Sequence, residues 1–242
     1  LCASGWPRTS SNPGGRSWST AARQAVLQAA RQGGARLIED HYLGDLDEPG
    51  SAPPRLAALA SGYPGVRVVR IHTFSKTLLP ALRLASISGE PALIARLLAL
   101  KVADDLGCSA YLQRTLAAFI ERGQYHRHLA RVRPRYAAVR ETLRGALGAL
   151  APAVVFEGPF AGFCMLGRLA PGIDAGRFLA ECARLGVLLT PVADYWFDGR
   201  HGHDRFRIGF GSLAAEEVLP VIAVLEQAAV AAANPEATRS LL

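Results

Sequence analysis

Residues 68 to 89 place a primary amine between two hydroxyl side chains, in the sequence VVRIHTFSKTLLPALRLASISG. The amine belongs to Lys76, one of only two lysines in a chain with 27 lysines and arginines together. An amine can form a Schiff base with an aldehyde, whereas a guanidinium cannot. Seven residues later Arg83 offers a planar fork suited to a phosphate, and Thr73 and Ser75 offer hydroxyls to the same anion. These groups suggest pyridoxal phosphate (PLP), although a basic residue at a strand end and an arginine on a helix would account for the same spacing.

The segments before Lys76 alternate between helix and strand, as is typical of a parallel sheet. A helix is predicted from 20 to 32, a short buried strand starts at 36, and a β-branched strand from 67 to 72 precedes the lysine. Side chains that do chemistry gather at the carboxyl ends of such strands. Asp40 and Tyr42 follow the first strand, so we expect them to converge with Lys76 on one crevice. Without Lys76, Asp40 would be read as a solvated turn residue.

Beyond the lysine segment the sequence predicts three helices and then shorter, alternating elements. The three helices are expected at 90–106, 111–121 and 124–150. The later elements are strands at 154–157, 163–169, 187–190 and 205–210. Helices are expected among them at 174–186 and 214–231. His126 and His128 are two residues apart and cannot share a helical face. His201 and His203 lie in a long polar loop without a third ligand. We therefore predict no metal site.

The bulk composition is that of a globular protein with one large or two modest domains. The 242 residues are 50% hydrophobic and 19% charged. No uninterrupted apolar run reaches roughly 18 residues, so a membrane span is not expected. Four widely spaced cysteines without a CxxC pair fit reduced thiols in the cytoplasm. The net charge of +7 comes from scattered arginines, which argues against direct DNA binding by these residues.

The segment FSKTLLPALRL resembles the lysine motif of fold-type I aminotransferases of class I and II. It is most similar to the aminotransferase-like half of MocR-type transcriptional regulators, the GntR subgroup that joins a winged helix to such a domain. The resemblance implies that Lys76 carries PLP, that Arg83 holds its phosphate, and that Thr73 and Ser75 complete the phosphate cup.

Three further segments extend this resemblance. IEDHY is similar to the family's IEDDY, which implies that Asp40 pairs with the pyridine nitrogen and Tyr42 reaches the 3-oxygen; His41 stands where the family usually has a second Asp. The turn NPGG departs by one residue from the family's NPTG, in which the asparagine, here Asn12, donates to the same 3-oxygen. FRIGF resembles the family's LRLGF, which implies that Arg207 grips a substrate α-carboxylate. Arg205 is the off-register alternative for that role.

The resemblance implies an α/β protein of the PLP-dependent transferase fold type I. Residues 1–125 would be the C-terminal part of the PLP-binding large domain, with a mostly parallel sheet, and 126–235 a small α+β domain, with a frayed tail at 236–242. The segment QYHRHL resembles the family's GxYxxHLRRLR, which leads into the small domain. The earlier half of the large domain and any winged helix would lie upstream of Leu1, so we expect an N-terminally truncated chain that forms a homodimer.

Three functions are compatible with these residues. The first is the effector-sensing half of a MocR/GntR-type regulator, which would bind PLP and an amino acid or amine and would reach DNA only through a domain absent from this chain. The second is a free-standing class I/II aminotransferase that moves an amino group between an amino acid and a 2-oxo acid, with Lys76 as the proton shuttle. The third is a degenerate domain kept for dimerisation.

Overall fold

The computed structural model describes residues 18–41, 44–46, 54–157, 162–196 and 201–233, which fold into two compact units. Unit 1 contains the described residues up to Arg133, and unit 2 contains those from Pro134 onward. The boundary falls inside the long helix α5 (Gln124–Ala146), which therefore contributes residues to both units. The predicted start of a small domain at 126 stays a prediction; the two compact units divide between Arg133 and Pro134 of this helix.

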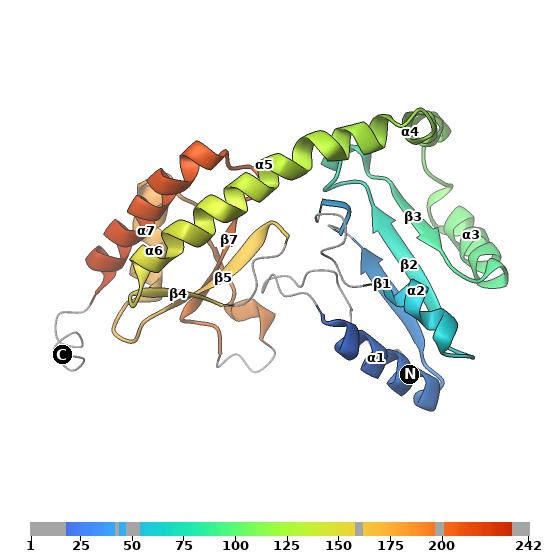
Figure 1. Cartoon of the computed structure of the whole chain (residues 1–242), viewed down its shortest axis with the longest axis horizontal. Helices are drawn as coiled ribbons and strands as arrows, with labels where there is room; N and C mark the ends of the chain where they lie inside the picture. The colour runs from blue at the N-terminus through green and yellow to red at the C-terminus, as the bar shows by residue number, and fades with distance from the viewer. Residues whose placement is uncertain (1–17, 42–43, 47–53, 158–161, 197–200, 234–242) are drawn as a thin grey trace. The chain divides into compact units, whose positions relative to one another are not determined.

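Unit 1 is built on a three-stranded sheet in the order β1-β2-β3 (Figure 1). The strands are β1 (Arg36–His41), β2 (Arg67–Thr73) and β3 (Ala85–Ser88). The first two pair in parallel, as the βαβ rhythm of the sequence predicts, and β3 pairs antiparallel to β2. The antiparallel strand was not predicted, because its sequence Ala-Ser-Ile-Ser alternates over only four residues, all of them exposed, and so short a run is a weak strand signal.

The helix before β1 follows the predicted bounds closely. In α1 (Thr20–Gly33) the Ser19 hydroxyl accepts a hydrogen bond from the Ala22 amide at 3.2 Å, and Gly34 ends the helix with a left-handed φ of 62°. Leu27 and Ala30 pack from this helix onto Leu37 of β1 and a leucine of the short helix α2 (Leu56–Leu59). This cluster is the apolar core of unit 1.

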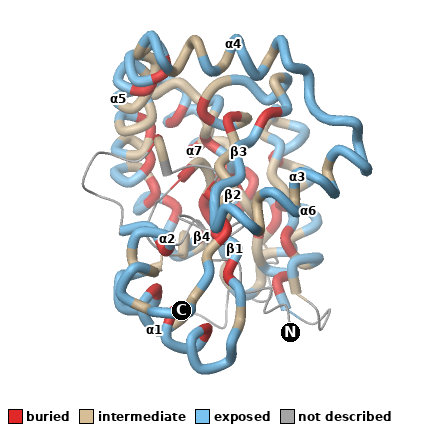
Figure 2. The backbone as a smooth tube through the Cα atoms, turned by 90° about the vertical axis from the view of Figure 1, so that its right-hand side faces the viewer, coloured by how far each residue is buried: buried red, intermediate tan, exposed pale blue. Residues whose placement is uncertain are grey.

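The next two helices, α3 (Pro91–Asp105) and α4 (Ala110–Glu121), bury none of their residues (Figure 2). Leu98 and Leu100 of α3 are 61% and 67% exposed. The sequence predicted both helices from their periodicity, but periodicity does not indicate how much of an apolar face is covered. None of the helices in the described part of the chain has the length and apolarity needed to cross a membrane.

Unit 2 is a four-stranded antiparallel sheet in the order β4-β5-β7-β6, packed with helices; Figure 1 labels β4, β5 and β7 of this sheet. Its elements after α5 are β4 (Val154–Glu157), β5 (Cys164–Leu169), α6 (Ala175–Arg184), β6 (Thr190–Pro191), β7 (Arg205–Gly209) and α7 (Val218–Ala232). The strand predicted at 187–190 is confined to Thr190 and Pro191. Residues 187–189 are instead tied to the end of α6, where the Val187 amide donates to the Cys182 carbonyl at 2.8 Å.

Gly167 of β5 is required by the packing of Phe206 against the sheet. A Cβ at this position would lie 2.5 Å from Phe206 Cζ. The ring cannot withdraw easily, because it is fully buried against Phe178, with ring centroids 5.0 Å apart. We expect Gly167→Ala to lower the free energy of unfolding by about 1–3 kcal/mol, the usual cost of overpacking a core, as measured by urea denaturation. Gly209→Ala is the matched strand control, since its Cβ would meet nothing nearer than 3.9 Å; an equal loss in both variants would contradict the packing argument.

Candidate functional site

Lys76 lies on a loop whose two ends are joined by the sheet. Thr73, the last residue of β2, pairs with Ala85, the first residue of β3. The Phe74 amide then donates to the Leu84 carbonyl at 3.2 Å, which closes the segment between them. Lys76 is exposed near the start of this closed loop, and Arg83 is exposed at its end. The hairpin geometry therefore holds the amine and the guanidinium at the same end of the sheet.

Arg83 has a backbone conformation that residues other than glycine rarely adopt. It follows the short 3-10 turn Pro80–Leu82 with φ 50° and ψ 34°, in the left-handed region. Such a residue costs on the order of 1–3 kcal/mol and persists only where its surroundings fix it, often at a binding site. Its amide donates to the Pro80 carbonyl at 3.3 Å. The alternative hypothesis, in which Arg83 is an ordinary arginine on a helix, does not match this conformation.

The hydroxyls predicted for the phosphate cup lie at the start of the same loop. The Ser75 amide donates to Thr73 Oγ1 at 3.2 Å, which turns the chain at the end of β2. Both residues are half-buried. A hydroxyl that accepts from an amide retains its own hydrogen as a donor, so Thr73 keeps the ability to bind an anion.

Asp40 lies on the face of the sheet that Thr73 also occupies. The parallel register pairs Asp40 with Ile71. Ile71 and Thr73 are two residues apart on β2, so their side chains point to the same face of the sheet. Asp40 is half-buried at the carboxyl end of β1. The strand ends thus bring Asp40 to the end of the sheet from which the Lys76 loop leaves. Asn12 and Tyr42 lie outside the described residues.

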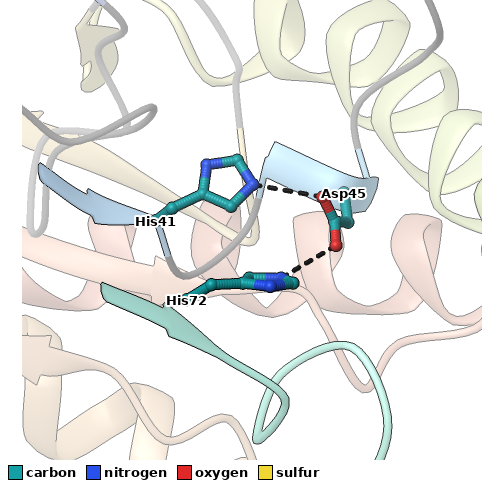
Figure 3. Close-up of side chains that lie close together, drawn as sticks. All are labelled: His41, Asp45 and His72. Carbon is teal, nitrogen blue, oxygen red and sulfur yellow. Dashed lines mark hydrogen bonds and ion pairs between the residues drawn. The ribbon is translucent and has the colours of Figure 1, made fainter. Parts of the chain in front are cut away.

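A second carboxylate, Asp45, was not predicted; it contacts His41 and His72 (Figure 3), which pair across β1 and β2 on the face opposite Asp40. His41 Nε2 lies 3.1 Å from Asp45 Oδ1, and His72 Nε2 lies 2.8 Å from Oδ2. The hydroxyl of Tyr125, on α5, donates to Oδ2 at 2.8 Å, and Arg55 lies 3.3 Å from Oδ1. Although burial opposes ionisation, these hydrogen bonds hold the pKa of Asp45 well below its usual range.

The surroundings of Asp45 favour a hydrogen-bonded carboxylate over a metal ligand. His41, Asp45 and His72 offer ligand atoms within 4.8 Å of one another. Both oxygens of the carboxylate are already engaged, and Arg55 and the half-buried Arg70 add positive charge beside it. A divalent cation would meet that charge and displace those bonds. We therefore interpret Asp45 as a hydrogen-bonding centre that joins β1, β2 and α5 within unit 1.

Two arginines of β7, in unit 2, are the predicted candidates for binding a carboxylate. Arg205 is paired with acidic partners: its Nη2 lies 3.2 Å from Glu157 Oε1, and its Nη1 lies 3.2 Å from Asp204 Oδ1. Arg207 is half-buried and donates to the hydroxyl of Thr190 at 3.4 Å. Both arginines therefore lie on β7, and the role of Arg207 in binding a carboxylate stays a prediction.

The sequence matches the family described as "Aminotransferase class I and II" over residues 8–225. The chain belongs to the class I and II aminotransferase family. Among curated proteins this aminotransferase-like domain is 28% identical to the HTH-type transcriptional regulator TauR of Rhodobacter capsulatus, over 85% of the chain and 42% of that protein. It is also 28% identical to aromatic-amino-acid aminotransferase 1 of Thermococcus litoralis, over 87% of the chain and 50% of that protein.

Solved structures agree with this assignment. The α-aminoadipate aminotransferase LysN of Thermus thermophilus, complexed with N-(5'-phosphopyridoxyl)-L-leucine, matches 96% of the chain and 58% of its own length, with 25% identity and a TM-score of 0.79. The fold is therefore that of the fold-type I aminotransferases, as the sequence resemblance predicted. The domain spans about half the length of the relatives it matches.

The residues of the aminotransferase-like domain fit a phosphorylated aldehyde. Residues 73–84 offer an exposed amine, an exposed guanidinium and the hydroxyls of Thr73 and Ser75 around one hairpin end, and Asp40 offers a carboxylate from the adjacent strand. A phosphate needs the donors and an aldehyde needs the amine. Sequence reasoning missed Asp45, Thr77, Tyr125 and His128 because their contacts join segments 48 to 80 residues apart.

Proposed function

We propose that this domain binds PLP through Lys76 and serves as the effector-sensing half of a MocR/GntR-type regulator. The observation that carries the proposal is the closed loop between β2 and β3, which holds Lys76 and Arg83 at one end of the sheet. The parallel register of β1 and β2 adds Asp40 to the same end. These three groups match the three parts of the cofactor: the aldehyde, the phosphate and the ring nitrogen.

Each residue of the site has a distinct task. PLP, when bound, supplies an aldehyde and a pyridine ring that acts as an electron sink. Lys76 provides the amine that attaches to the aldehyde and can take up a proton. Arg83, with Thr73 and Ser75, binds the phosphate. Asp40 keeps the proton on the ring nitrogen by its negative charge. Asn12 and Tyr42 are proposed, from the resemblance alone, to bond the 3-oxygen.

The relatives support a sensing role as the first candidate. TauR and a second relative, the HTH-type regulator YhdI of Bacillus subtilis at 32% identity, each match the domain over less than half of their own length. Contact with DNA would belong to a part of the protein outside this chain, in a cytoplasmic homodimer. The resemblance to the aminotransferase of Thermococcus litoralis supports the second candidate, transfer of an amino group to a 2-oxo acid.

Addition of PLP to the protein tests the proposal. We expect a visible absorbance band that borohydride removes by reducing the imine, with the reduced cofactor recovered on the peptide that contains Lys76. Amino acids and amines are then added one at a time. A sensor changes its spectrum without sustained production of a 2-oxo acid, whereas an aminotransferase produces it over many turnovers. Absence of both the band and the reduced adduct would reject the proposal.

Arg207 is expected to bind the carboxylate of the amino ligand without contributing to cofactor binding. Arg207→Ala removes a charge-assisted pair worth about 1.5–3 kcal/mol, so we expect the dissociation constant of a carboxylate ligand to rise about 10- to 100-fold. The dissociation constant of PLP should not change. Arg205→Ala is the matched control, because its guanidinium is already paired with Glu157 and Asp204. Equal losses of PLP and carboxylate binding in Arg207→Ala would contradict this role.

A further inference from the structure

Thr77, the residue after Lys76, is the most constrained residue at the start of the lysine loop. It is 3% exposed, whereas Lys76 is exposed. Its carbonyl accepts a hydrogen bond from His128 Nε2 at 2.8 Å. Its hydroxyl is hydrogen-bonded to the hydroxyl of Tyr125 at 3.2 Å. The loop is therefore anchored one residue away from the amine, through both the backbone and the side chain of Thr77.

Both anchors come from the beginning of α5. Tyr125 and His128 are three residues apart, so they lie on one face of the helix. The Tyr125 ring also packs against Phe74 at the start of the loop, with ring centroids 5.8 Å apart. The Tyr125 hydroxyl is itself held by Asp45 at 2.8 Å. A third α5 residue, Arg133, donates from Nε to the Asp45 carbonyl at 2.9 Å, which fixes the helix against the same turn.

We propose that Tyr125 and His128 are positioning residues for Lys76, acting through Thr77; the proposal rests on the proposed role of Lys76 as the cofactor lysine. A lysine side chain has several rotatable bonds, so the placement of its amine depends on how firmly the backbone beneath it is held. Functional groups need their supports locked by packing and hydrogen bonds to reach a productive geometry. The two α5 side chains lock the peptide that follows Lys76 and thereby limit the directions in which its amine points.

The first test uses the cofactor-free protein. Tyr125→Phe removes the hydroxyl and keeps the ring, Thr77→Val removes the partner hydroxyl, and His128→Leu removes the donor to the Thr77 carbonyl. Hydrogen exchange of the Phe74 and Leu78 amides, which donate to Leu84 and Phe74 within the loop, reports its local opening. Loss of one buried hydrogen bond should speed this exchange by about tenfold. His128→Gln retains a donor near the Nε2 position and should restore slow exchange.

The second test uses the protein with PLP bound. The pH midpoint of the absorbance band reports the environment of the Lys76 nitrogen, which a purely structural residue would not alter. We expect it to move by about half a unit or more in Tyr125→Phe and His128→Leu, the shift that about one lost hydrogen bond allows, and to return in His128→Gln. Val139→Ala is the control, because it removes packing from the core of unit 2 on the same helix without touching the loop.

The outcomes separate the proposal from the function on which it rests. Unchanged loop exchange and an unchanged pH midpoint in the hydroxyl and imidazole variants would overturn the positioning role. The same conclusion follows if Val139→Ala changes both readouts equally, since the effect would then be general destabilisation. If the unmodified protein forms no band with PLP, the proposed function fails, and the exchange measurement alone decides whether α5 holds the loop.

Discussion

Lys76→Ala is expected to abolish the visible band of bound PLP and the adduct trapped by borohydride. The variant removes the amine that forms the covalent bond to the aldehyde, and an arginine-rich chain offers few substitutes because guanidinium groups do not form imines. The rate of any aminotransferase reaction should fall by about 10²- to 10⁴-fold, which is the usual contribution of a positioned proton-transfer group. Absorbance spectroscopy and peptide mass analysis after reduction measure the two effects directly.

The chain provides its own control for this result. Lys101 is the second of the two lysines and lies on α3, where it pairs with Asp105 on the helix surface. Lys101→Ala should leave the band, the adduct and the affinity for PLP unchanged. Recovery of the reduced cofactor on the Lys101 peptide, or a normal band in Lys76→Ala, would show that the site has been assigned to the wrong amine.

The sequence was sufficient for the parts of the fold that local patterns determine. The Ser19 cap and the left-handed Gly34 lie directly at the two ends of α1, and the apolar periodicity of α6 and α7 indicates a buried face. The parallel pairing of β1 with β2 followed from the helix-length connection between them. The antiparallel β3 has no comparable signal, because its formation depends on the closure of the lysine loop rather than on its own residues.

In the candidate site, too, the residues of a local motif were predictable and those held by long-range contacts were not. Lys76 and Arg83 are seven residues apart, and a motif of that length can be recognised directly. Asp45 is held by Tyr125 and by the strand-end histidines, and no local pattern links a turn carboxylate to a phenol 80 residues later. The spacing of His128 and His126 predicts only that the two cannot share a metal, and it gives no sign that His128 donates to the Thr77 carbonyl. Buried polar networks of this kind are specified by tertiary packing, which composition and spacing do not encode.

Glu39 is the residue whose loss should destabilise unit 1 most. It is fully buried on β1, next to Asp40, and its Oε1 lies 3.6 Å from Nη1 of the equally buried Arg23 of α1. The same carboxylate accepts the Leu56 amide at 2.9 Å and the Ala57 amide at 3.3 Å, which caps α2. One side chain therefore ties β1 to a helix on each side of it in the sequence.

We expect Glu39→Ala to lower the free energy of unfolding by about 3–5 kcal/mol, because it leaves the Arg23 charge buried without a counter-charge. Burial already lowers the pKa of Arg23, and Glu39 opposes that shift. Glu90→Ala is the matched control: Glu90 lies 2.8 Å from Arg67, but that pair is about half exposed, and exposed pairs contribute only about 0–1 kcal/mol. Urea denaturation measures both. If the two variants lose similar stability, burial of the Glu39–Arg23 pair does not add to its contribution. In that case β1 would also hold Asp40 in place without the Glu39 carboxylate.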